Sequence, residues 1–178
     1  MSIDGRFIKH LSMELHQELE GGRIQKVSQI SYSDFLFSIR ANKINHQLYL
    51  SLSTSAPRMY LIDQTLNHFE NPGGFGMFLR KHVEGGQIIK ISTINNDRII
   101  KITYQNINDL GDEVIYHLIF ESFGRYTNLI ITDQFDVILN AYKHIHPFEQ
   151  IDRIVINGAK YLPPKDEKID PEDFSNVQ

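Results

Sequence analysis

The sequence predicts an α+β fold in which two related halves, each a helix followed by an antiparallel meander, form a β-sandwich flanked by the helices. Three observations lead to this expectation: two amphipathic segments, about eight short runs of alternating apolar residues, and one repeated segment. The repeat reads EGGRIQK at 20–26 and returns as EGGQIIK at 84–90. With 178 residues, the chain is long enough to bury a core as one domain.

The first helix is expected over residues 6–20. Ile8, Leu11, Leu15 and Leu19 recur at spacings of three and four, which places them on one helical face. Polar and charged residues fill most of the intervening positions. Ser2 or Asp4 can cap the start, so the segment is predicted to be an amphipathic helix packed on a core.

The second helix is expected over residues 72–84, with Asn71 as its cap and Pro72 in its first turn. Its apolar stripe consists of Phe75, Phe78, Leu79 and Val83. Both helices are expected to end at a Gly-Gly pair, at 21–22 and 85–86, because a left-handed C-cap favours a residue without a β-carbon.

The strands are expected from period-two alternation of apolar residues. In the first half they cover 27–30, 35–39 and 48–52, and in the second half 88–94, 98–104, 114–121, 128–132 and 137–142. Because each copy of the repeat is a helix, a Gly-Gly stop and a strand, Ile24 and Ile88 are predicted to lie in equivalent elements.

Composition narrows the function classes. The chain has no cysteine, which excludes disulfides, thiol catalysis and thiolate metal sites within it. Net charge is −4, but residues 1–105 carry 12 Lys/Arg against 9 Asp/Glu, whereas residues 106–178 carry 6 against 13. This asymmetry favours an oriented contact of the first half with phosphates, although scattered solvating charge would give the same composition. The N-terminal residues contain no signal-like apolar run, so we expect a cytoplasmic protein with no membrane partner.

One turn carries a candidate binding pair. Asn95-Asn96-Asp97 is expected to close a hairpin, and Arg98 follows it directly. An acceptor beside a rigid guanidinium suits phosphate, carboxylate or a nucleotide edge. In the first half we match this turn to Asp34-Phe35, where an apolar residue takes the place of Arg98. A plain structural turn is the competing interpretation.

Further cations are candidates for a basic face. Arg80, Lys81 and His82 lie on the second helix and Lys90 on the next strand, although cations near a helix C-terminus are also favoured by its dipole. His144 and His146 lack a third ligand at motif spacing, so we expect no metal site. The glycines at 73–76 resemble an anion-binding turn without the accompanying lysine. With no catalytic dyad or cofactor motif, the protein is predicted not to be an enzyme and to use no cofactor.

Six ordered blocks resemble the N-terminal domain of the NFACT family: MSIDG at 1–5, GRIQKV at 22–27, LRKHVEGG at 79–86, NDRII at 96–100, GRYTNLI at 124–130 and YLPP at 161–164. The resemblance covers residues 1–164. It implies a fold similar to the N-terminal domain of formamidopyrimidine-DNA glycosylase, without that enzyme's chemistry. Residues 165–178 are expected to be an acidic linker to further C-terminal modules.

The resemblance also implies a task. It points to binding obstructed large ribosomal subunits and recruiting tRNA, alanyl-tRNA in bacteria, for template-free C-terminal tailing. The family's Asp-Arg pair maps onto Asp97 and Arg98 as tRNA-binding residues, with Arg125 added to the RNA-facing cations. Because some family members are labelled fibronectin-binding, a cell-surface adhesin remains the alternative function.

Overall fold

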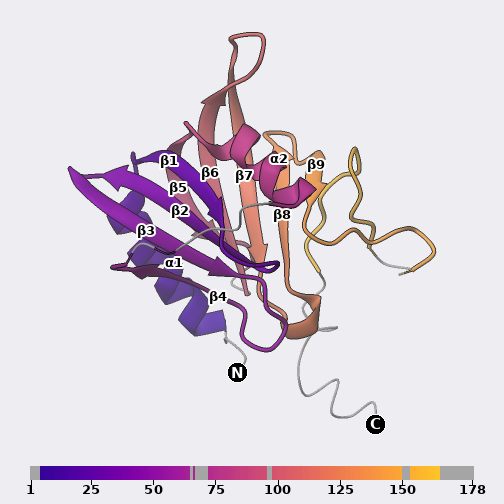
Figure 1. Ribbon diagram of the computed structural model, residues 1–178. Coiled ribbons are helices and arrows are strands. Elements are labelled where there is room, and N and C mark those ends of the chain that lie inside the picture. The colour runs from indigo at the N-terminus through magenta and orange to yellow at the C-terminus, as the bar shows by residue number, and fades with distance from the viewer. Residues whose placement is uncertain (1–4, 65, 67–71, 96–97, 150–152, 165–178) are drawn as a thin grey trace.

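The computed structural model describes residues 5–64, 66, 72–95, 98–149 and 153–164 (Figure 1). Within them it has two α-helices, one 3₁₀ helix and nine strands. In chain order these are α1 (Gly5–Leu19), β1 (Arg23–Gln29), β2 (Asp34–Ala41), β3 (Ile44–Ser51), β4 (Arg58–Ile62), α2 (Gly74–Val83), β5 (Gln87–Thr93), β6 (Ile99–Ile107), β7 (Glu113–Glu121), η1 (Gly124–Tyr126), β8 (Asn128–Asp133) and β9 (Ile138–Ala141).

The nine strands form one antiparallel sheet in the order β4-β3-β2-β1-β5-β6-β7-β8-β9. The α+β class is therefore correct, but the expected pair of separate sheets is replaced by one continuous sheet. Strands β1–β4 run obliquely to strands β5–β9 (Figure 1), and both groups supply side chains to one core cluster. β4 was not expected from the sequence.

The two halves are related as the repeat predicted. Ile24 and Ile88 lie at matching places in β1 and β5, and each N–H donates to a glycine carbonyl of the other half: Ile24 to Gly86 and Ile88 to Gly22, both at 2.8 Å. Both first strands also carry a register shift just after this residue. The repeating unit is a helix followed by four strands, so β4 corresponds to β8, and β9 is an addition.

Both helices end just before their Gly-Gly pair, as expected. Gly21 and Gly85 have φ of 78° and 88°, the left-handed region that favours glycine. α2 begins later than predicted, at Gly74, with Gly73 as a cap that makes no side-chain bond, while Asn71 lies outside the described residues. The Gly73 N–H instead donates to Oε1 of Gln29 at 3.0 Å, so a protein side chain occupies this helix start.

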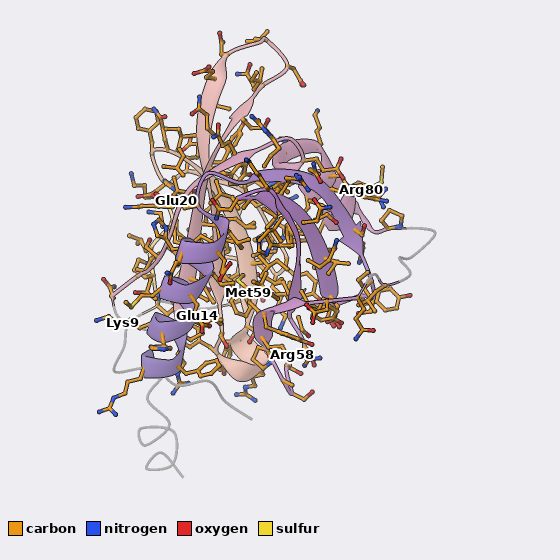
Figure 2. All side chains as sticks on the ribbon, turned by 90° about the vertical axis from the view of Figure 1, so that its left-hand side faces the viewer. Lys9, Glu14, Glu20, Arg58, Met59 and Arg80 are labelled. Atoms are coloured by element: carbon orange, nitrogen blue, oxygen red, sulfur yellow. The ribbon has the colours of Figure 1, made fainter. Side chains whose placement is uncertain are left out.

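Each helix packs on the sheet strands of the other half. α1 packs mainly on β5 and α2 on β1. Figure 2 shows Lys9, Glu14 and Glu20 along α1 on the opposite side from Arg80 of α2. Since each helix covers the first strand of the other half, the two halves close one shared core and cannot be separated without exposing it.

A second, smaller core lies on the opposite face of β6–β9. It includes Ile99, Ile119 and Ile130, which are covered by Val155 and Tyr161 from the segment after β9. The chain thus folds back over its own sheet before residue 165. Within the described residues, no helix is long and apolar enough to cross a membrane.

Candidate nucleic-acid interface

The β5–β6 turn and the β7–β8 connection lie at one end of the sheet. Asn95 takes a left-handed φ of 56°, and the Ile94 N–H donates to the Ile99 carbonyl at 3.2 Å, which holds the ends of β5 and β6 together. Arg98 is half-buried, and its carbonyl accepts from the Ser122 N–H at 2.8 Å. Asp97 lies outside the described residues, so the accessibility of the Asp97-Arg98 pair stays a prediction.

The β7–β8 connection presents an arginine and an aromatic ring together. The Phe123 N–H donates to Oγ1 of Thr127 at 3.2 Å, and Gly124 has φ of 58°, which gives the turn its shape. Arg125 Nη2 donates to the Tyr126 hydroxyl at 2.8 Å, and its guanidinium carbon lies 5.0 Å from that ring's centroid. Both side chains are exposed. A cation paired with an aromatic face can contact phosphate and stack on a base.

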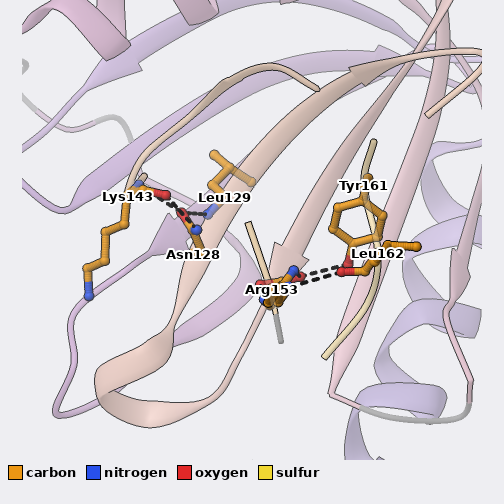
Figure 3. Close-up of polar contacts among 7 residues, drawn as sticks. Asn128, Leu129, Lys143, Arg153, Tyr161 and Leu162 are labelled. Carbon is orange, nitrogen blue, oxygen red and sulfur yellow. Dashed lines mark hydrogen bonds and ion pairs between the residues drawn. The ribbon is translucent and has the colours of Figure 1, made fainter. Parts of the chain in front are cut away.

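Lys143, which follows the C-terminal end of β9, also lies at this end of the sheet. Its Nζ donates to the Arg125 carbonyl at 3.1 Å, and burial lowers the pKa of its ammonium group. Asn128 holds the backbone of Lys143 on both sides, donating to its carbonyl and accepting from its N–H, each at 2.9 Å (Figure 3). Lys143 was not among the cations predicted from the sequence, because its contact with the Arg125 carbonyl joins residues 18 apart in the chain and leaves no local motif.

A buried carboxylate fixes the strand end beneath this surface. Glu121 is fully buried, accepts two hydrogen bonds from Arg153 and accepts a third from the Tyr161 hydroxyl at 2.7 Å. Arg153 Nε also donates to the Leu162 carbonyl at 2.9 Å. Figure 3 shows the Arg153, Tyr161 and Leu162 side of this cluster. Burial and the charge of Glu121 raise the pKa of Tyr161, so the phenol stays a donor.

The cations expected around α2 are not gathered into one face. The half-buried Arg80 donates from Nε to the Val27 carbonyl at 3.3 Å, and Lys81 pairs with Asp109 at 3.5 Å. His82 stacks on Phe78 with ring centroids 3.9 Å apart. Lys81 and Arg98 lie at opposite ends of β6, whose nine residues span about 30 Å.

Lys90 lies elsewhere again, exposed on β5 opposite Thr103 of β6. Thr103 Oγ1 is 3.0 Å from Nδ1 of His117, and burial followed by the charge of Lys101 lowers the pKa of that histidine. Of the cations selected from the sequence, the structure brings Arg125 to the end where Arg98 lies.

Strand pairing also corrects the match between the two hairpins. Phe35 lies opposite Gln29 and Ile100 opposite Thr93, so Ile99 corresponds to Asp34 and Arg98 to Ser33. The carbonyls of Ser33 and Arg98 accept equivalent bonds, from Leu52 N–H at 2.7 Å and Ser122 N–H at 2.8 Å. Phe35, which the sequence comparison matched to Arg98, is therefore two positions out of register.

The two histidines make ordinary contacts. His144 Nε2 lies 3.1 Å from Oδ1 of Asn157, and His146 stacks against Phe148. Across the described part of the chain, no three His, Asp or Glu side chains gather as a metal site would require.

Comparison with known proteins defines the class. The family model described as "NFACT N-terminal and middle domains" matches residues 4–178, so the chain belongs to the NFACT family. A Bacillus subtilis protein named Rqc2 homolog RqcH is 39% identical across 96% of this chain, which spans 30% of that relative. The yeast protein named Ribosome quality control complex subunit 2 is 27% identical over 70% of the chain, or 11% of its own length.

A solved structure gives the same fold. The N-terminal part of the fibronectin/fibrinogen-binding protein of Streptococcus suis superposes with a TM-score of 0.88 at 34% identity, covering 93% of this chain and 62% of that one. The relatives thus carry both ribosome quality-control and matrix-binding names. Similarity to the glycosylase domain stays a prediction.

Proposed function

We propose that this chain is the RNA-facing N-terminal module of a ribosome-associated quality-control factor, and that it binds rather than catalyses. In the full-length protein it would contact large ribosomal subunits obstructed by peptidyl-tRNA and recruit tRNA, alanyl-tRNA in bacteria, for C-terminal tailing. The observation that carries the proposal is the cluster of Arg125, Tyr126 and Lys143 at the end of the sheet that also holds Arg98.

This cluster suits an RNA loop better than an extended duplex. Arg125 supplies a charged fork for phosphate, and the half-exposed ring of Tyr126 offers a stacking face for an unpaired base. The names of two relatives, Rqc2 homolog RqcH and Ribosome quality control complex subunit 2, also support a role in ribosome quality control. The acidic residues of the second half disfavour a large polyanion footprint, so the contact is expected to be local and oriented.

The test is salt-dependent binding of the full-length protein to tRNA and to large subunits. Three or four phosphate contacts would give a log-log slope of about −2 to −3. Replacing Asp97 and Arg98 by Ala, or Arg125→Ala, should weaken binding and reduce tailing. Lys90→Ala is the matched control, since that lysine is exposed in the middle of β5, opposite Thr103, and lies at neither end of the sheet. Equal effects at Lys90 and Arg125 would contradict the proposed surface.

A matrix-binding function is favoured by one observation, the name of the related solved structure. It requires the protein at the cell surface, whereas the proposed role is cytoplasmic. Fibronectin binding through main-chain hydrogen bonds and apolar area would depend little on salt. Salt-insensitive nanomolar binding to fibronectin, together with no RNA binding at low salt, would replace the first proposal by the second.

A further inference from the structure

The β6–β7 hairpin differs from its counterpart in the first half. Two residues, Asn42 and Lys43, connect the paired positions Ala41 and Ile44. Seven residues, 107–113, connect the equivalent positions Asn106 and Val114. Figure 1 shows that this longer hairpin extends well beyond the rest of the sheet, at the end opposite the β7–β8 connection. The shared fold does not require the extension, because the first half closes the same pair without it.

The tip of the hairpin has a defined shape. Asn108 N–H donates to the Asp112 carbonyl at 2.9 Å, and Asn108 Oδ1 accepts from the N–H groups of Leu110 at 3.0 Å and Asp112 at 2.9 Å. Gly111 takes a φ of 85°. An asparagine that bonds the backbone two and four residues on pre-organises the turn, so little ordering entropy is lost when a partner binds.

The base of the hairpin is fastened to α2. Asn106 Nδ2 donates to the carbonyls of His82 at 3.0 Å and Glu84 at 3.1 Å. Lys81 reaches across to Asp109. These contacts fix the direction in which the hairpin projects from the domain.

The tip combines exposed apolar side chains with acidic ones. Leu110 is 85% exposed and Ile107 65%. Asp109, Asp112 and Glu113 are exposed beside them in the chain, and Lys81 offsets one of these charges. A phosphate backbone would be repelled by this acidic rim and would leave Leu110 without a partner. An apolar socket on a basic protein surface complements both features.

We propose that the β6–β7 hairpin docks onto a protein of the large ribosomal subunit, inserting Leu110 into an apolar socket rimmed by Lys and Arg side chains. This rests on the proposed function, since it takes the subunit as the site of action. The Arg98 end and the hairpin lie at opposite ends of β6, so the module contacts RNA with one end and protein with the other.

The experiment places a photoreactive benzophenone amino acid at one position of the full-length protein, which is then bound to purified large ribosomal subunits and irradiated. We expect the probe at position 110 to crosslink to a subunit protein, at a peptide whose neighbours are Lys and Arg. The same probe at position 125 is the matched control and is expected to crosslink to RNA. A crosslink from position 110 to RNA would overturn the proposal.

Two variants of the full-length protein measure the contribution of the contact. Leu110→Ser should weaken subunit binding about tenfold, because it removes the inserted side chain. Exchanging residues 107–113 for the two-residue turn of the first half should weaken it at least as much, and its melting temperature checks folding. Because Leu110→Ser removes no charge and no phosphate contact, the salt slope of that variant should match that of the parent protein.

The outcomes separate this proposal from the proposed function. If position 125 crosslinks to RNA while position 110 crosslinks to nothing and Leu110→Ser binds normally, the hairpin proposal fails and the RNA-facing function stands. If the full-length protein does not bind subunits at all and neither position crosslinks, the proposed function fails, and the docking proposal fails with it.

Discussion

The two halves of the domain share a framework and differ at its ends. β1–β4 and β5–β8 pair in the same order, and their first strands exchange equivalent hydrogen bonds through the glycine carbonyls. The first half closes its middle hairpin with Asn42 and Lys43, whereas the second half builds a projecting tip. The backbone contacts between the halves therefore constrain the glycine positions, while new surfaces arise in the connections between strands.

The same contrast holds beneath the candidate interface. In the first half, Asp34 accepts hydrogen bonds from the hydroxyls of Ser33, Tyr49 and Ser51. In the second half, Glu121 stands at the position of Ser51 and is paired with Arg153. A hydroxyl network therefore corresponds to a buried ion pair, which also holds down the segment after β9.

Breaking that ion pair should cause the greatest loss of stability. Arg153→Met should lower the free energy of unfolding by about 3–5 kcal/mol, because Glu121 would be left buried without its charged partner. Chemical denaturation of the purified domain measures it. Ser51→Ala, at the position equivalent to Glu121, should cost about 1 kcal/mol. Equal losses of stability would show that the hydroxyl network at Ser51 and the ion pair at Glu121 contribute alike.

The next effect tests the framework itself. A methyl group at Gly86 would lie 2.6 Å from Cδ2 of Tyr104, and one at Gly22 would lie 2.8 Å from Cβ of Ala41. Both alanine variants should lose about 1–3 kcal/mol of stability. Gly74→Ala meets nothing within 4 Å at the start of α2 and should be neutral or slightly stabilising. A loss at only one of the two matched glycines would break the equivalence of the halves.

A smaller effect depends on pH. Ser38 Oγ and Gln47 Oε1 are 3.0 Å apart in the first half, and the equivalent pair in the second half is Thr103 with His117. Because the pKa of His117 is lowered by burial and then by Lys101, the native state binds fewer protons than the unfolded chain just below the ordinary value of 6.5. The part of the folding stability that depends on a neutral His117 is therefore fully present above pH 6.5, and it is lost as the pH falls below that value.

His117→Gln makes the second half resemble the first and should remove that part of the pH dependence. Unfolding curves of both proteins between pH 7.5 and about pH 5 measure the difference. Lys90 also lowers the pKa of His117, whereas Asp133 and Asp136 raise it. Parallel curves for parent and variant would contradict the assignment of the effect to His117.

The smallest effect concerns the Lys81–Asp109 ion pair; among the described residues, no ion pair forms beside the short turn of the first half. The two side chains are 64% and 87% exposed, so Lys81→Ala should change stability by less than about 0.5 kcal/mol. Thermal melting at low and high salt checks this expectation. A larger loss would mean that the pair, and not the amide of Asn106, fastens the hairpin to α2.

Periodicity predicted both helices and eight of the strands, because their apolar residues recur at spacings set by backbone geometry. It missed β4, a five-residue edge strand in which only Met59 is fully buried, so its alternation is weak. It also misjudged the start of α2, where the bond from Gly73 to Gln29 replaces a local cap. Long-range contacts of this kind leave no periodic signal.

The repeated unit of helix, Gly-Gly and strand follows from the sequence alone, because positive φ at Gly21 and Gly85 is a local backbone demand. The register that makes Arg98 equivalent to Ser33, and the contact between Lys143 and Arg125, arise only in the folded chain. Those relations depend on hydrogen bonds between residues far apart in the chain, including the bond from Lys143 Nζ to the Arg125 carbonyl. Strand pairing and chain reversal create such neighbours, and neither is encoded at a fixed sequence spacing.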